Sequence, residues 1–150
     1  MATYDIYFAI LPEAEQLDAA GRVFSFGYQS AVGIKGPQKL VNRWLKCLFT
    51  SKGSDLSNNK YGTGFPNLLG SNISRYQDFT DAVALFISDC NGQITAMDQA
   101  QFPPDNERLE SATLTNVVAR GADGYDVYVS LKNVAGDLLT MQLPTGSTRA

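Results

Sequence analysis

Residues 76–102 read YQDFTDAVALFISDCNGQITAMDQAQF, and this stretch decides the fold. Pro103 and Pro104 follow it and end the predicted helix at Phe102, because proline lacks a backbone N–H for the next turn. Gly92 lies inside and costs about 1 kcal/mol relative to alanine, so it marks where the helix would bend or break. The apolar side chains trace one stripe over about six turns, formed by Tyr76, Phe79, Val83, Phe86, Ile87, Cys90, Ile94 and Met97.

The residues around Tyr76 carry the signals of a helix start. Ser74 and Gln77 have the spacing of a capping box, in which each side chain bonds to the other residue's backbone N–H. Asp78 and Asp81 follow near the positive end of the helix dipole, which favours acids. We therefore expect a helix from Tyr76 to Phe102.

The sequence after the two prolines predicts a three-stranded meander. Residues 108–119 are rich in Leu, Thr and Val, and residues 125–132 alternate between apolar and polar side chains. Turns are predicted at GADG (121–124) and AGD (135–137), and the third strand covers residues 138–143. The tail from Pro144 to Ala150 is expected to fray.

The last predicted strand, LLTMQL at 138–143, contains neither a charge nor a proline. The outer strand of a meander exposes unpaired N–H and C=O groups, which charges or prolines usually protect. We predict that this edge binds a strand of another subunit through Leu138, Thr140, Met141 and Leu143. On this interpretation Met141→Pro removes one donor and leaves the core folded. The alternative is that amino-terminal strands cover the edge within the same domain.

The amino-terminal half predicts two strands and a shorter helix. Residues 4–11 and 22–28 alternate as strands do, and residues 12–21 between them form either a long hairpin loop or a short helical insert. Gly36 and Pro37 fit the N-cap and first position of a helix that ends near Phe49. Its apolar side is formed by Leu40, Val41, Trp44, Leu45 and Leu48.

The other side of this shorter helix is basic. Lys39, Arg43 and Lys46 recur at a spacing that places them on one face. Either this face is solvated, or it binds an acidic patch on a neighbouring subunit.

From Thr50 to Asn72 the composition shifts to Ser, Asn, Gly and Lys. A loop of this length inside a compact domain is usually functional or held by a partner. The segment KYGTGF at 60–65 can be interpreted as a phosphate-binding loop, but no Gly-Lys-Ser/Thr follows it. A glycine-rich turn packed by Tyr61 and Phe65 is the preferred interpretation.

The composition restricts the classes of function. The 150 residues, 44% of them hydrophobic, suit a single domain over residues 1–150. A net charge of −3 and a pI of 4.8 argue against a nucleic-acid partner. No apolar run reaches the roughly 18 residues of a transmembrane helix, and the first residues predict a strand and no signal peptide. We therefore expect neither nucleic acid nor membrane as a partner.

The chain contains no histidine. This removes His-activated nucleophiles, His-ligated zinc and the usual general base near neutral pH. Cys47 and Cys90 are predicted to be buried free thiols, and two cysteines cannot complete a zinc site. The closest acid pairs are Glu107 with Glu110 and Asp78 with Asp81, and the second pair sits where the helix dipole lowers pKa values, the wrong direction for a general acid. We expect no catalytic, cofactor or metal site.

The order of these pieces over residues 32–143 resembles the baseplate wedge and sheath-initiator family of contractile phage tails, also described as lysozyme-like. The segment 36–65 is similar to the family's helix with a Leu-Leu-Thr step, a glycine, a polar loop and a Tyr-Gly pair, here Leu48, Phe49, Thr50, Gly53, Tyr61 and Gly62. The long helix then runs into an elbow where the family has Glu-Pro-Arg, whereas here Glu107 and Arg108 are adjacent. Residues 1–31 lie outside the resemblance.

The resemblance implies a structural role. The domain would dock on baseplate wedge proteins around the tail tube, in several copies forming a ring, and its exposed strands would template the first ring of tail sheath protein by strand exchange. Its location would be the virion tail baseplate, and the host cytoplasm during assembly. A peptide-binding or protein-binding adaptor and a lysozyme-like muralytic enzyme are the alternatives. The expected fold is α+β, with two main helices packed on a small mixed or antiparallel sheet that ends in the meander.

Overall fold

The long amphipathic stretch forms the helix α3 (Tyr76–Gln101). The computed structural model of the chain describes residues 35–69, 75–120 and 124–144. Its other elements are α1 (Pro37–Phe49), α2 (Phe65–Leu69), η1 (Asp105–Glu107), β1 (Leu109–Ala119), β2 (Tyr125–Asn133) and β3 (Leu138–Pro144). The predicted strands at 4–11 and 22–28, and the tail beyond Pro144, lie outside the described residues.

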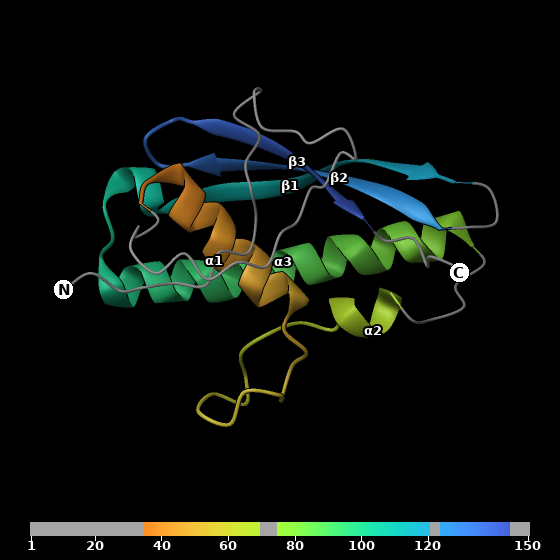
Figure 1. The fold of residues 1–150 in the computed structure, drawn as a ribbon, viewed down its shortest axis with the longest axis horizontal. Coiled ribbons are helices and arrows are strands. Elements are labelled where there is room, and N and C mark those ends of the chain that lie inside the picture. The colour runs from red at the N-terminus through yellow and green to blue at the C-terminus, as the bar shows by residue number, and fades with distance from the viewer. Residues whose placement is uncertain (1–34, 70–74, 121–123, 145–150) are drawn as a thin grey trace, which may run out of the picture.

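The three strands form one antiparallel sheet in the order β1-β2-β3 (Figure 1). The register aligns Val117 of β1 and Leu143 of β3 with Val127 of β2, so apolar side chains of neighbouring strands share one face. The predicted α+β fold with a carboxy-terminal meander is confirmed, and the sheet is antiparallel.

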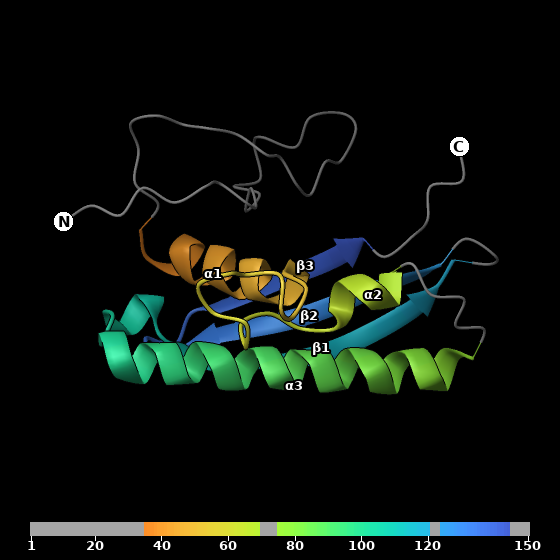
Figure 2. The ribbon, with the colours of Figure 1, turned by 90° about the horizontal axis from the view of Figure 1, so that it is seen from below.

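The helices lie together on one face of the sheet (Figures 1 and 2). Helix α3 contacts β1, while α1 contacts both α3 and β2. The strand residues that face this layer are fully buried in β2, namely Val127, Val129 and Leu131. Each large apolar side chain that is buried in this way contributes about 1.5 to 3 kcal/mol.

Trp44 ties the two layers together at the centre of the core. Its side chain is fully buried, and its indole Nε1 donates a hydrogen bond to Asn91 Oδ1 at 2.9 Å. The Asn91 amide in turn donates to the carbonyl of Ala112 at 2.7 Å. This chain of bonds joins α1, α3 and β1 and satisfies polar atoms that burial would otherwise leave unpaired.

The helix ends agree with the sequence in α1 and differ in α3. Gly36 is the N-cap of α1 and Pro37 its first residue, as predicted. The N-cap of α3 is Arg75, without a side-chain cap, one residue after the predicted Ser74. Ser74 lies outside the described residues, so the capping box stays a prediction; the Gln77 amide N–H donates to Asp81 Oδ1 at 2.8 Å.

The helix α3 is continuous through Gly92 and ends at Gln101, with Phe102 as a left-handed C-cap whose N–H bonds to the carbonyl of Asp98. The predicted long loop from Thr50 to Asn72 contains α2, so the irregular part that precedes α2 ends at Gly64.

Candidate functional site

The strand β3 lies at the rim of the sheet, where it pairs with β2 on one side only among the described strands. Its residues 138–143 carry no charge or proline. These are the features of an edge that can accept a further strand.

The direction of each backbone group in β3 follows from the β2–β3 turn. The Asn133 N–H donates to the carbonyl of Asp137 at 3.2 Å, which makes these two residues a hydrogen-bonded pair. In an antiparallel ladder such pairs alternate with non-bonded ones. With the observed register, this alternation has Leu139, Met141 and Leu143 bond to β2, while Leu138, Thr140 and Gln142 direct their N–H and C=O groups to the rim that no other described strand occupies.

The side chains of β3 divide in the same way between two faces. Leu143 is fully buried in the core, and Leu139 and Met141 pack against it. Leu138 is 67% exposed and Thr140 is also exposed, both on the face away from the helices. Of the four predicted contact residues, only Leu138 and Thr140 present both side chain and backbone outward. The premise of the Met141→Pro expectation, an outward N–H at this residue, does not hold, because the alternation directs the Met141 N–H toward β2.

A cluster of charged side chains holds the elbow between α3 and β1. Asp98 is 3% exposed, and its two carboxylate oxygens accept from Arg43 Nη2 at 2.6 Å and from the Leu109 N–H at 2.8 Å. Arg43 Nη1 also donates to the carbonyl of Glu107 at 3.3 Å. One guanidinium of α1 therefore joins the end of α3 to η1. Removing one partner of such a buried pair is costly because it leaves the other charge unpaired.

Glu107 and Arg108, the adjacent pair predicted at the elbow, both make local bonds. Glu107 accepts from the Gly36 N–H at 3.1 Å and forms an ion pair with Lys39 at 3.0 Å. Burial alone would raise the pKa of Glu107, but the Gly36 N–H and the charges of Lys39 and Arg43 outweigh it and lower the pKa. Arg108 donates to Asp105 Oδ1 at 2.8 Å, which closes the elbow from the other side.

The basic face of α1 is largely internal. Lys39 and Arg43 pair with Glu107 and Asp98 of the same chain. The solvated interpretation does not hold for Arg43, whose side chain is 11% exposed, whereas the Lys39 side chain is 29% exposed and keeps contact with solvent. Lys46 is exposed, and a contact between it and a neighbouring subunit stays a prediction.

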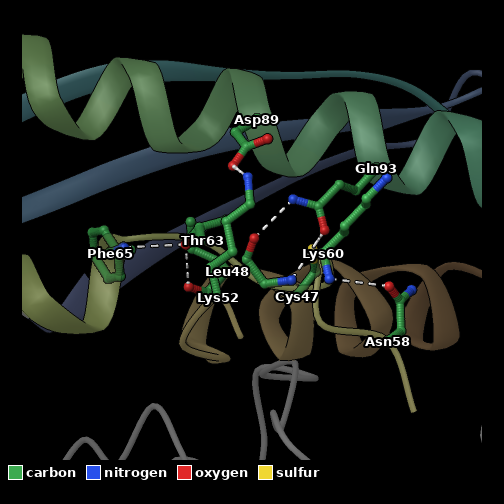
Figure 3. Close-up of polar contacts among 10 residues, drawn as sticks. Cys47, Leu48, Lys52, Asn58, Lys60, Thr63, Phe65, Asp89 and Gln93 are labelled. Carbon is green, nitrogen blue, oxygen red and sulfur yellow. Dashed lines mark hydrogen bonds and ion pairs between the residues drawn. The ribbon is translucent and has the colours of Figure 1, made fainter. Parts of the chain in front are cut away.

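The Tyr61–Gly62 pair closes the loop between α1 and α2, and Figure 3 shows the Gln93 side chain of α3 reaching this loop beside Thr63. The Gly62 N–H donates to Gln93 Oε1 at 3.0 Å, and Gln93 Nε2 donates to the Gly62 carbonyl at 2.8 Å. The Thr63 N–H bonds to the carbonyl of Thr50 at 2.9 Å, and Tyr61 packs against the core. The Gly62 N–H is thus occupied, which favours the structural turn over the phosphate-binding loop.

Cys47 and Cys90 lie on facing helices, and both side chains are fully buried. Cys90 Sγ contacts the carbonyl of Trp44 at 3.4 Å, and Cys47 Sγ contacts Gln93 Oε1 at 3.5 Å. Burial raises the pKa of the Cys90 thiol, which disfavours its reactive thiolate.

The acids near the elbow, Glu107 and Glu110, are both held in ion pairs with lysines. Glu107 has a lowered pKa, whereas a general acid needs a raised one. Glu110 pairs with Lys132 at 3.0 Å. Within residues 35–69, 75–120 and 124–144, no group of three or more His, Cys, Asp or Glu side chains could hold a metal.

No helix in the described part of the chain has the length and apolar character needed to span a membrane. The sequence matches no protein-family model and no curated protein, and no solved structure matches the fold.

Proposed function

We propose that this protein is a structural subunit of a contractile-tail baseplate, whose β3 edge accepts a strand of the sheath protein. The observation that carries the proposal is the uncharged rim of β3, where Leu138, Thr140 and Gln142 direct backbone groups outward. The resemblance over residues 32–143 supplies the kind of assembly and the partners, namely sheath, wedge proteins and, as a further candidate, the tail tube.

The elbow and the closed loop support this role because they stiffen the domain. A partner strand gains only about 0.5 to 1.5 kcal/mol from each main-chain hydrogen bond. A rigid edge loses little conformational entropy on binding, so more of that gain appears as affinity. Repetition of the joint around a ring multiplies the effect.

The variant Thr140→Pro tests the proposal. Proline removes the outward N–H and is tolerated on an edge strand, so the domain should fold while each joint loses about 1 kcal/mol or more. Sheath assembly on purified baseplates, scored by electron microscopy, should fall sharply. Thr140→Val keeps the N–H and should assemble normally.

The variant Met141→Pro is the control that separates a loss of folding from a loss of strand exchange. Met141→Pro breaks the β2–β3 ladder and should lower the melting temperature, which Thr140→Pro should do only slightly. Normal sheath assembly on a folded Thr140→Pro protein would refute strand exchange at this edge. Genes for tail tube and sheath beside this gene would favour the baseplate over a cellular adaptor, and their absence would count against it.

A further inference from the structure

The outward flank of α3 contains a shallow groove. A hollow of about 650 Å³ runs over Leu85, Ser88, Gly92 and Ala96. Phe86, Asp89 and Gln93 line its side, where Asp89 meets Lys52 and Gln93 holds Gly62 (Figure 3). Leu85 is 65% exposed in this groove.

The groove has the dimensions of a helix contact. Its floor residues recur every three or four positions and span roughly 16 Å of α3. They lie on the side opposite to the buried stripe that includes Val83, Ile87 and Ile94. A row of small side chains with one exposed leucine along a single helix suits another helix better than a compact small molecule.

No contact among the described residues explains the glycine at position 92. A Cβ built at this position meets no atom within 4 Å, and the backbone is helical. Glycine here costs about 1 kcal/mol relative to alanine. Glycine, which has no side chain, would allow the backbone of a neighbouring helix to approach α3 closely.

The charge of α3 indicates the character of the neighbour. Its 26 residues include four aspartates and no lysine or arginine. Asp98 is used at the elbow and Asp89 is paired with Lys52, while Asp78 and Asp81 lie on the same side of α3 as the groove. The exposed side of α3 is therefore an apolar groove with two further aspartates toward the amino-terminal end of the helix.

We infer that this groove binds an amphipathic helix of a different protein, in which lysine or arginine flanks a large apolar residue. A second copy would place the acids of α3 against each other, which costs free energy. Residues 1–34 contain four acids and one arginine, so their charge also disfavours them as the occupant. The groove faces away from the sheet, so this proposal and strand exchange at β3 can fail separately.

The test uses the full chain, labelled with ¹⁵N, and a capped synthetic peptide of about 16 residues. The peptide is an amphipathic helix of Leu, Ala and Lys with one central Phe, and a second peptide carries Glu in place of every Lys. The Lys peptide should shift amide resonances between Leu85 and Ala96, and binding should weaken as salt is raised.

Two variants at one position provide the control. Gly92→Leu fills the groove and should weaken binding at least about tenfold, whereas Gly92→Ala should bind within about threefold of the original chain. Both should melt no lower than the original, since the position is open and glycine is the poorer helix former. Equal affinity of the Gly92→Leu protein, equal binding of the Glu peptide, shifts elsewhere, or self-association through this face would each overturn the inference.

Discussion

Gly62 sets the shape of the loop that joins α1 to α2. Its φ is 100°, and an added Cβ would overlap the carbonyl oxygen of Thr50. Its own N–H and C=O bind the amide of Gln93. A side chain at this position would push apart the two ends of the loop and the contact with α3.

Gly62→Ala should therefore lower the free energy of unfolding by roughly 2 to 5 kcal/mol, from backbone strain and overpacking together. Gly53→Ala is the matched control, because Gly53 has a φ of 89° in the same loop but an added Cβ meets nothing within 4 Å. It should cost only about 1 to 2 kcal/mol. Urea unfolding of both variants measures the difference, and equal losses would show that the contact with Thr50 does not matter.

At the scale of elements, the elbow joins α1, α3 and β1 through charges that depend on pH. The pKa of Glu107 is lowered in the folded state from the ordinary value of 4.5. A lowered pKa means that this group stabilises the fold above pH 4.5. That contribution is lost as the pH falls through the folded-state pKa.

We expect Glu107→Gln to have a lower free energy of unfolding than the original chain at neutral pH. The difference between the two free energies should become smaller as the pH falls. Glu110→Gln is the control, because it makes the same chemical change in an exposed ion pair with Lys132, and such pairs contribute about 0 to 1 kcal/mol. Thermal unfolding followed across the acid range measures both. A stability difference between Glu107→Gln and the original chain that does not change with pH would contradict the role of the Glu107 charge in the elbow.

The sequence predicted the elements better than it predicted the contacts between them. The stripe of α3, the Gly36–Pro37 start of α1 and the meander are local patterns, and the structure has all three. The partners of Lys39 and Arg43 are at least 55 residues away in sequence, so spacing alone could not find them. One signal was present, because Asp98 follows Ile94 by four residues and so continues the buried stripe with a charge.

The phase of the β3 ladder could not be predicted either. Alternation in residues 138–143 is weak, since four of the six are apolar, and the direction of each N–H depends on how the turn at Asn133–Asp137 closes. The sequence analysis took the Met141 N–H as an outward donor, whereas in the structure the outward donors belong to Leu138, Thr140 and Gln142.

For the whole molecule, the central claim is that a two-layer domain keeps an open edge at β3 for a partner. Backbone hydrogen exchange of the full chain on its own, followed residue by residue, tests this most directly. We predict that the amides of Thr140 and Gln142 exchange rapidly while those of Leu139 and Met141, which bond to β2, are protected. Protection of all four amides in the isolated chain would contradict the account, because the edge would then already be covered from within.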